Sequence, residues 1–289
     1  MGQKPADIPE ATLRSLYLDE RKSQEEIAAI LGCSQGAVWR RMRKYGIAAR
    51  DTSESGIVRN GSHRQDFDGD LCTKAYMLGF CKGDVHPWIR DKNSQTIRLM
   101  TATTKSEQIL LFEQLFSPYG HIYIGTPDRR GATHMAAYVN MTMAFLLDRE
   151  DSIPDWVLED TEPFFAFFAG YVDAEGHIGV HNGYAVFKLD TYDRNIIITS
   201  HEILNRHGIT GSVPFVCTRQ GTQTKQGHLY RQDMWRLQVA RKASLLLMFQ
   251  RIKPYLKHRK RIQDMESAIQ NIEYRNQLKL QKFTKETPL

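Results

Sequence analysis

Cysteine is scarce in this sequence of 289 residues, and long apolar runs are absent. The four cysteines form no CxxC pair and show no metal-ligand spacing, so neither a zinc site nor a disulfide framework is indicated. The longest apolar run, residues 164–172, is far shorter than the ~20 residues needed to cross a bilayer. The start of the chain lacks the apolar core of a signal peptide. These absences predict a soluble protein of a reducing, cytoplasmic compartment, with no membrane partner.

An excess of acidic charge is absent as well. The formal net charge is +6, and the positive excess is concentrated in residues 241–289, which hold twelve Lys and Arg against four Asp and Glu. Such a basic segment is typical of a surface that faces phosphate groups. The chain is long enough for one large domain or two to three small ones, each with a real core.

Two nine-residue segments share one pattern, and the rest of the chain is organised around them. The stronger copy is Phe168-Ala-Gly-Tyr-Val-Asp-Ala-Glu-Gly176, and the weaker copy is Met77-Leu-Gly-Phe-Cys-Lys-Gly-Asp-Val85. Aligned without a gap, both have a glycine in the third position, a small residue in the seventh and an acid in the eighth. The two acids are Asp84 and Glu175. Each copy ends an apolar run and leads into a segment that is expected to be a strand.

Small residues four positions apart would form a smooth notch on one face of a helix. The pairs are Gly79 with Gly83, and Gly170 with Ala174. Two notched helices can bring their backbones unusually close together. Each acid would then lie at a helix C-terminus, where exposed carbonyl groups already make the potential negative. Two such ends that meet would repel each other unless a cation lies between them, so the pattern predicts a bound metal.

The two segments, with their spacing, resemble the signature of the LAGLIDADG homing endonucleases over roughly residues 71–265. The alternative is two unrelated amphipathic helices that each end in an acid. The resemblance implies a metal-dependent DNA endonuclease in which Asp84 and Glu175, with Gly83 and Ala174 beside them, form the metal site. Each acid would anchor metal at one scissile phosphate, so that both strands are cut across the minor groove. Oxygen ligands with partial hydration favour Mg²⁺ or Mn²⁺.

The resemblance also implies an α+β fold of two pseudo-symmetric αββαββα repeats that form a LAGLIDADG-like saddle. We expect the first repeat in residues 71–155 and the second in residues 156–289, with basic C-terminal helices. Each repeat would have an antiparallel sheet with helices on its back and polar residues on a concave face. Double-stranded DNA is the partner that such a face fits, and two diverged halves suit a long asymmetric target bound by a monomer.

Any one polar residue on these strands has an ordinary explanation as a solvated residue, and only the set argues for binding. The candidate DNA-facing residues are His86, Trp88, Arg90 and Arg98 in the first repeat, and His177, His181, Lys188, Arg236 and Gln238 in the second.

The N-terminal segment, residues 1–47, is expected to be an all-α helix-turn-helix domain. Ser23 and Glu26 form a capping box before a second helix, Gly32 falls in the turn, and Ser34 can cap a third helix. Ile30 is among the residues expected to face inward. The third helix would expose residue types that read base edges or hold phosphates, namely Gln35, Arg40, Arg41, Arg43 and Lys44. The alternative is a helical bundle with a basic solvated face. Polar residues 48–70 are expected to be a linker.

A basic cluster follows the second repeat, in Pro254-Tyr-Leu-Lys-His-Arg-Lys-Arg261. It resembles the Pro-aromatic-Leu-lysine segment of the family, which implies that a basic residue here assists catalysis. The candidates are Lys257, Arg259 and Lys260, among which the sequence does not choose. Arginine cannot shuttle a proton at neutral pH, so Arg259 would act electrostatically. A helix start that contacts phosphate is the alternative.

The first motif departs from the family pattern. Val85 replaces its final glycine, Lys82 replaces its first acid, and no matching basic cluster follows the first repeat. Lys82 could lie near Asp84 and compete with metal for the carboxylate. A nicking enzyme, or a non-cleaving DNA-binding protein of the same fold that acts as a regulator or an intron maturase, is therefore the rival interpretation. A third class, an RNA-binding or structural module, predicts binding that ignores DNA sequence.

Overall fold

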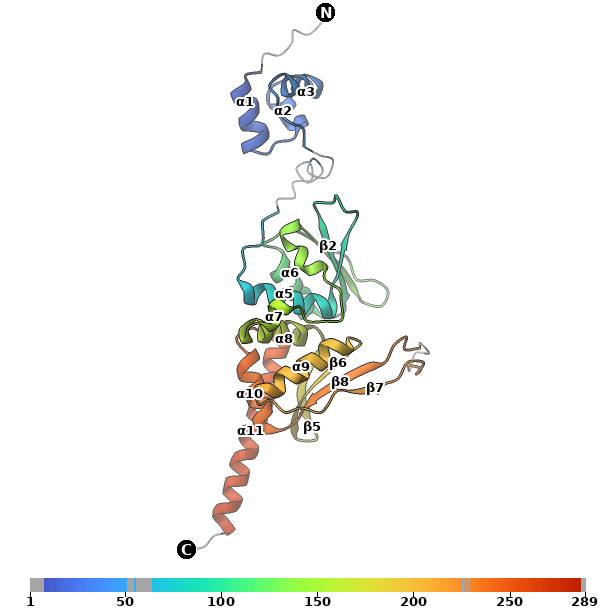
Figure 1. Ribbon diagram of the computed structural model, residues 1–289, viewed down its shortest axis with the longest axis vertical. Helices are drawn as coiled ribbons and strands as arrows, with labels where there is room; N and C mark the ends of the chain where they lie inside the picture. Colours follow the sequence, from blue (N-terminus) through green and yellow to red (C-terminus); the bar gives the residue numbers. More distant parts are fainter. Residues whose placement is uncertain (1–7, 51–54, 56–63, 225–226, 228, 287–289) are drawn as a thin grey trace, which may run out of the picture.

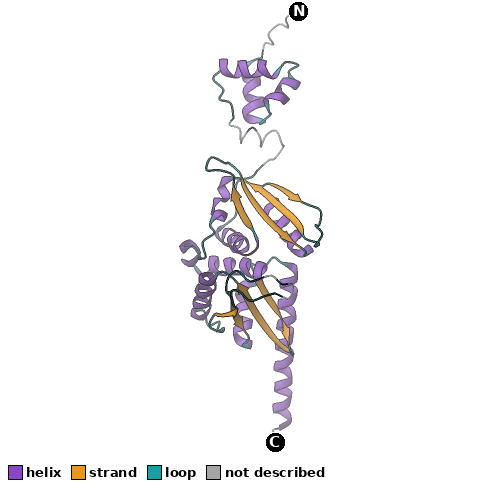
Figure 2. Ribbon diagram, turned by 90° about the vertical axis from the view of Figure 1, so that its right-hand side faces the viewer, coloured by secondary structure: helices purple, strands orange, loops and turns teal. Residues whose placement is uncertain are grey.

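The computed structural model describes residues 8–50, 55, 64–224, 227 and 229–286, with side chains in the last helix described as far as residue 278. An N-terminal helical unit lies at one end of the long axis of the molecule (Figure 1). We name it the three-helix unit, because its first two helical segments, residues 10–14 and 15–19, are continuous. A body of two halves lies next to it, and one long helix extends from the body to the other end (Figures 1 and 2).

The N-terminal unit has the predicted turn and caps. Its elements are α1 (Glu10–Arg14), the π-helix η1 (Ser15–Asp19), α2 (Gln24–Ile30) and α3 (Gln35–Lys44). The Ser23 hydroxyl accepts from the Glu26 N–H at 3.2 Å, and the Glu26 carboxylate accepts from the Ser23 N–H at 2.7 Å, which confirms the capping box. The unit has its own small core, separate from that of the body. The prediction for Ile30 is wrong: it is 56% exposed, whereas Ile27 and Ala28 in the same turn are buried, because the covered face of α2 does not extend to its last residue.

The body consists of two units with the same order of elements. The first has α5 (Leu71–Asp84), β1 (His86–Ile89), β2 (Ile97–Thr103), α6 (Ser106–Phe116), β3 (His121–Ile124), β4 (Thr133–Val139) and the 3₁₀ segment η2 (Met141–Leu147). The second has α8 (Thr161–Glu175), β5 (Gly176–His181), β6 (Tyr184–Thr191), α9 (Arg194–Arg206), β7 (Phe215–Thr218), β8 (Met234–Val239) and α10 (Lys242–Ile252). The helix α7 (Asp155–Leu158) connects the units, and α11 (Arg259–Glu286) follows the second.

Each unit has one four-stranded antiparallel sheet. The strand order is β1-β2-β4-β3 in the first and β5-β6-β8-β7 in the second. This topology, repeated with α5 and α8 in equivalent places, confirms the predicted α+β fold of two LAGLIDADG-like repeats. The two motif helices lie where the halves of the body meet (Figure 1).

The motif helices begin at side-chain caps and are buried along most of their length. Asp70 accepts from the Thr73 N–H at 2.7 Å before α5, and Asp160 accepts from the Thr161 N–H at 2.6 Å before α8. Every residue from Pro163 to Asp173 is buried. Pro163 is tolerated because the first turn of a helix has N–H groups without intrahelical partners. A helix that is apolar on all sides is expected at the centre of a body rather than on its surface.

The two described ends of the predicted linker belong to the neighbouring units. Arg50 donates from its backbone to the Tyr17 hydroxyl at 2.8 Å, within the three-helix unit. Phe67 packs its ring against Tyr119 and Phe145 of the first repeat, with centroids 5.5 and 5.1 Å apart. Between these ends, residues 51–54 and 56–63 lie outside the described residues. Within the described part of the chain, no helix has the length and apolarity of a membrane span.

Candidate metal and DNA site

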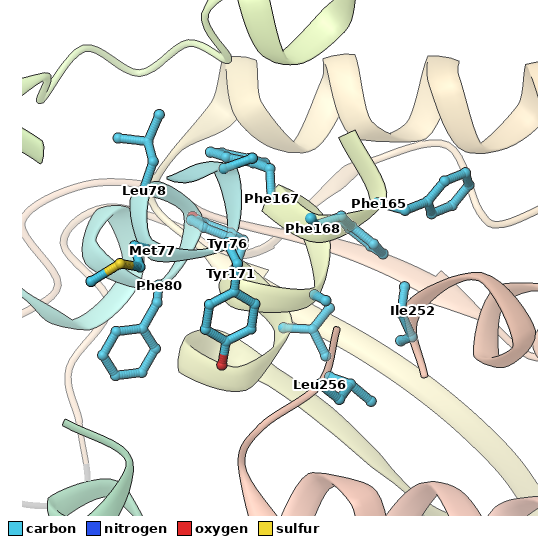
Figure 3. Packing of buried hydrophobic residues seen from close by; sticks show 14 of the residues in the cluster. Tyr76, Met77, Leu78, Phe80, Phe165, Phe167, Phe168, Tyr171, Ile252 and Leu256 are labelled. Carbon is cyan, nitrogen blue, oxygen red and sulfur yellow. The ribbon is translucent and has the colours of Figure 1, made fainter. Parts of the chain in front are cut away.

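The motif helices α5 and α8 cross with their backbones in contact, and glycines make this possible. A Cβ atom added to Gly79 would lie 2.0 Å from the Phe167 carbonyl oxygen, and one added to Gly170 would lie 2.1 Å from the Tyr76 carbonyl oxygen. No side chain fits at such distances. Large apolar side chains of both helices surround the crossing, among them Phe80 (Figure 3). The predicted notches therefore face each other, as the spacing of small residues requires.

The second pair of small residues brings the helix ends together. A Cβ atom on Gly83 would lie 2.5 Å from the Ala174 Cβ and 3.0 Å from the Glu175 Cγ. The last residue of α5 is Asp84 and the last residue of α8 is Glu175. The two acids therefore extend from helix ends that touch.

Both acids hold protons more tightly than free carboxyl groups do. Burial raises the pKa of Asp84 to about 6. Burial also raises the pKa of Glu175 to about 7, with further contributions from the negative charges of Asp84 and Asp193. The Asp193 carboxylate is held nearby by the Tyr171 hydroxyl, which donates to it at 2.6 Å. Desolvation and like charge both disfavour two carboxylates at this place, so their repulsion would be relieved by a bound cation.

Three residues that the sequence analysis did not single out complete the surroundings of the acids. The positive charges of Lys105 and Arg261 offset part of the rise in the pKa of Asp84 and in the pKa of Glu175. Gln108, on α6, donates a hydrogen bond from its amide to the Asp84 carboxylate. Arg261 closes the basic segment already noted, and its side chain is half-buried. Lys105 and Gln108 belong to no motif, so only the fold reveals them.

The residue at the sixth position of each motif copy connects the helix end to the rest of its repeat, and the two residues have opposite charges. The Asp173 carboxylate, fully buried, accepts from the Tyr76 hydroxyl and from the backbone N–H groups of Lys257 and His258 at 2.6, 2.7 and 3.0 Å. The equivalent residue in the first repeat is Lys82.

Lys82 does not compete for Asp84, contrary to the expectation from the sequence. Its ammonium group donates to the Asp148 carboxylate at 3.1 Å and to the Glu150 carbonyl at 2.8 Å. The side chain is 4% exposed. Both partners follow η2, so Lys82 ties α5 to the end of the first repeat and the carboxylate of Asp84 is left to other groups.

Two of the three predicted catalytic cations share a groove, and the third is paired on the surface. Lys257 and the exposed Arg259 line a groove with Glu107 of α6, and the Lys257 ammonium lies 5.1 Å from the centre of the Tyr76 ring. Lys260 pairs with Asp264 at 2.9 Å on the surface of α11. None of the three is among the charges that shift the pKa of Asp84 or of Glu175. Their catalytic role stays a prediction.

The predicted DNA-facing residues within the strands lie on the face opposite the core, and Arg90 follows the end of β1. On β8, Leu237 and Val239 are fully buried, while Arg236 and Gln238, which alternate with them, are partly exposed. Exposed members of the set are His86, Trp88, Arg90, His177 and His181; half-buried members are Arg98, Lys188, Arg236 and Gln238.

At equivalent places the two sheets carry different chemistry. Two rows of directly paired residues each begin two positions after a motif acid. The row in the first sheet is His86, Met100 and Ala136; the row in the second is His177, Lys188 and Gln238. In the first row Met100 is half-buried and Ala136 is buried, whereas the second row offers an ammonium group and an amide at these places.

On the three-helix unit, α3 presents a basic and aromatic surface. Gln35, Arg40, Arg43 and Lys44 are exposed, and Arg41 is half-buried. Trp39 is 44% exposed, and the Arg43 guanidinium lies 5.1 Å from the centre of its ring. Trp39 was not among the residues predicted to face DNA.

The donor chemistry at the crossing suits a hard divalent cation, although the protein supplies few ligands. The two acids are oxygen donors of the type that Mg²⁺ and Mn²⁺ prefer. Among the described residues, no cluster of three or more His, Cys, Asp or Glu side chains could hold a metal ion. A site built on Asp84 and Glu175 would need further oxygen ligands from backbone carbonyls such as those of Gly83 and Ala174, from water or from a bound phosphate.

No protein-family model and no curated protein matches the sequence. Solved structures are similar to it. The homing endonuclease I-DmoI, in complex with DNA and Mn, is 14% identical over 63% of this chain and 97% of that chain, with a TM-score of 0.42. The N-terminal LAGLIDADG domain of DUF199/WhiA is 13% identical over 64% of this chain and 82% of that chain, with a TM-score of 0.40. Full-length DUF199/WhiA from Thermatoga maritima is 12% identical over 73% of this chain and 63% of that chain, with a TM-score of 0.44.

Proposed function

We propose that this protein is a site-specific endonuclease that hydrolyses both strands of a DNA duplex with divalent metal held between its motif helices. The observation that carries the proposal is the meeting of Asp84 and Glu175 at two touching helix ends. A protein that needed only to pack these helices would gain nothing from two acids whose pKa values are raised to about 6 and about 7. The cost of keeping them there is explained if their charged forms are used.

The residues at the crossing fit Mg²⁺ or Mn²⁺, with Asp84 and Glu175 as the charged ligands. A divalent cation bound there would supply an activated water and stabilisation of the leaving oxygen. Lys105 and Arg261 bring positive charge to the same place. They would attract the scissile phosphates and keep the charged forms of the acids populated.

The concave faces of the two sheets would hold the duplex on either side of this centre. Each half carries paired strands with an outward polar or aromatic set, a shape that can enter the major groove. Because the two rows of paired residues differ in chemistry, the halves would read different sequences. This supports a long asymmetric target for a single chain, with α3 of the N-terminal unit in a further major groove beside it.

Unequal surroundings of the two acids favour nicking as the second candidate function. Asp84 accepts a hydrogen bond from Gln108, whereas Glu175 faces the additional negative charge of Asp193. The two strands would therefore be cut at different rates. At the limit one site is inactive and the protein nicks, or both are inactive and it only binds, as a regulator or maturase would.

Plasmid cleavage separates these functions. Duplexes bound by the protein in EDTA would first be selected from a random library and cloned into a supercoiled plasmid, which would then be incubated with Mg²⁺ or with EDTA. Linear product that depends on Mg²⁺ is expected. A nicked circle would identify one active site, and a mobility shift without breakage would identify a binder.

The assignment of the acids is tested by variants in the same assay. Asp84→Asn and Glu175→Gln are each expected to abolish linear product, since each removes one charged ligand from the shared centre. Glu202→Gln, an exposed acid on α9, serves as the control and is expected to cut normally. Linear product from the Asp84→Asn/Glu175→Gln double variant would contradict the proposed site.

A further inference from the structure

One arginine on the DNA-facing side of the second sheet is held in a fixed orientation by an acid on the neighbouring strand. Asp190 of β6 is paired directly with Arg236 of β8. The Arg236 Nε and Nη2 atoms both donate to the Asp190 carboxylate at 2.6 Å, one to each oxygen. This is the bidentate geometry in which a guanidinium is oriented as well as bound.

The orientation leaves the other edge of the guanidinium available. The guanidinium has five N–H donors, and Asp190 uses the one on Nε and one of the two on Nη2. The second N–H of Nη2 and both N–H groups of Nη1 remain. No further hydrogen bond of the Arg236 side chain is present within the described part of the chain, and the side chain is 28% exposed. The remaining edge presents two parallel donors.

The pair lies on the two central strands of the second sheet, β6 and β8. Strand β8 is flanked by β6 and β7, and Phe215 of β7, which is paired with Arg236, is 45% exposed. Trp235, the neighbour of Arg236 on β8, points to the opposite side of the sheet, where Arg194 of α9 lies 5.2 Å from its ring centre. Arg236 therefore faces away from the helices.

We propose that Arg236 reads a guanine in the major groove, and that Asp190 is the positioning residue that aims it. The inference rests on the proposed binding of double-stranded DNA. Two parallel donors match the O6 and N7 acceptors of guanine, and no other base offers two acceptors side by side in that groove.

A phosphate is the other partner that accepts two parallel N–H bonds, and the surroundings argue against it. Asp190 neutralises the charge that would attract a phosphate, and its two bonds prevent Arg236 from swinging toward the duplex backbone. At the equivalent pair in the first sheet, Ala102 takes the place of the acid on the central strand, and the acid near His134 is Asp128 of the segment before β4, with its carboxylate 3.5 Å from the His134 Nε2. A cross-strand acid paired directly with a basic residue is therefore present at this position only in the second sheet.

Selection of duplexes from a random library, in EDTA, measures the effect without any need for cleavage. The wild-type protein is expected to prefer G·C at one position by about 10- to 100-fold. Arg236→Ala and Arg236→Lys should each reduce this preference to about 2-fold, with other positions unchanged, because neither variant can donate two parallel bonds. Glu202→Gln removes an acid from the helical side of the same half and should leave the preference intact.

Asp190→Asn separates positioning from a merely structural role. It should weaken the preference for guanine by roughly tenfold, while its affinity for random duplex DNA rises, because a negative charge leaves the DNA-facing side. A structural role predicts a lower melting temperature and weaker binding to every duplex. In the Asp190→Asn/Arg236→Ala double variant the losses of preference should not add, since both act through one contact.

A modified duplex tests the contact without altering the protein. With 7-deazaguanine at the selected position, wild-type binding should fall about tenfold, because the N7 acceptor has been removed. Binding by Arg236→Ala should not change, because this variant lacks the guanidinium that would contact N7. Unchanged preference in the Arg236 variants overturns the inference. The inference is also overturned if the Arg236 variants bind all sequences equally more weakly and the slope of log affinity against log salt falls by about one. That result would identify a phosphate contact. A wild-type protein that binds no duplex DNA, or binds without preference, overturns the proposed function itself.

Discussion

At the scale of single residues, the protein is defined by two carboxyl groups at a place that opposes their ionisation. Asp84 and Glu175 are desolvated, adjacent and located at the negative ends of helix dipoles. Lys105 and Arg261 offset this only in part, since the pKa of each acid remains above its usual range. The metal-free protein is therefore expected to hold protons at this centre near neutral pH.

This proton uptake predicts a pH-dependent stability. Both folded-state pKa values are raised, to about 6 and about 7, so the folded protein binds more protons than the unfolded chain between about pH 4 and pH 7. The stabilisation is complete below the unfolded pKa values and is lost as the pH rises through the folded values. In EDTA, urea unfolding should show a free energy lower at pH 8 than at pH 5 by on the order of 2 kcal/mol for each acid.

The Asp84→Asn/Glu175→Gln double variant is the control for that measurement, and its stability should lack this component. Added Mg²⁺ should restore wild-type stability at pH 8 and have little effect at pH 5, because the acids must be charged to bind it. Parallel pH profiles for the wild type and the double variant would contradict the coupling.

At the scale of secondary-structure elements, the crossing of α5 and α8 is what delivers the acids to one place. Backbone contact at Gly79 and Gly170 sets the distance between the helices. Lys82 and Asp173 then tie the helix ends to the segments that close each repeat. The two residues have opposite charges, and both connections are made, because Lys82 donates to oxygen acceptors and Asp173 accepts from N–H donors.

Replacement of a crossing glycine should therefore be costly. Gly79→Ala places a methyl group 2.0 Å from a carbonyl oxygen of the other helix, so the helices must separate. Although alanine is the better helix former by up to about 1 kcal/mol, we expect a net loss of about 3 kcal/mol or more in urea unfolding, and loss of cleavage.

Two other helical glycines provide the comparison. Gly83→Ala meets a methyl group at 2.5 Å rather than a backbone atom, so its loss should be smaller. Gly36→Ala in α3 has open space, with its nearest contact the flexible Arg40 side chain at 3.6 Å, and should be neutral or slightly stabilising. Equal effects of all three substitutions would show that the crossing distance does not matter.

At the scale of the whole molecule, the surfaces proposed to face DNA are distributed over separate units. The three-helix unit has its own core, and the body has another. The two sheets differ at equivalent positions, and α3 adds a basic surface that lies apart from the crossing helices. Recognition would then be spread along a duplex, while cutting would be confined to one place.

The proposed separation of DNA recognition by α3 from cleavage at the motif helices can be tested on the full chain. In an Arg40→Ala/Arg43→Ala/Lys44→Ala variant, protection of DNA from nuclease digestion should disappear on one flank of the site. The cut position should not move, because the acids are unaffected. The slope of log affinity against log salt should fall by about 2–3, at roughly 0.9 for each lost phosphate contact.

Lys253→Ala, which removes one exposed positive charge from the body after α10, serves as the control and should leave that flank protected. A triple variant with an unchanged footprint would show that α3 does not contact DNA.

The sequence alone determined the pattern of the fold. Periodic apolar residues, caps such as the Ser23–Glu26 box and the two motif copies are local features, and local features depend on neighbours within a few positions. They were sufficient to predict the notched helices and the meeting of Asp84 with Glu175, and the fold of two like repeats came from the family resemblance that the motif copies carry. The assignment of Ile30 failed because periodicity does not show where a helix stops being covered.

Only the tertiary structure decided which other groups surround the acids. Lys105 and Gln108 come from the first repeat and Arg261 from the last helix, and their approach depends on how distant segments pack. The same is true of Lys82, which turns away from Asp84 to Asp148, and of Asp190, which aims Arg236 from the next strand. Charges act through space over several ångströms, so their partners are set by packing between segments that the sequence separates by tens of residues.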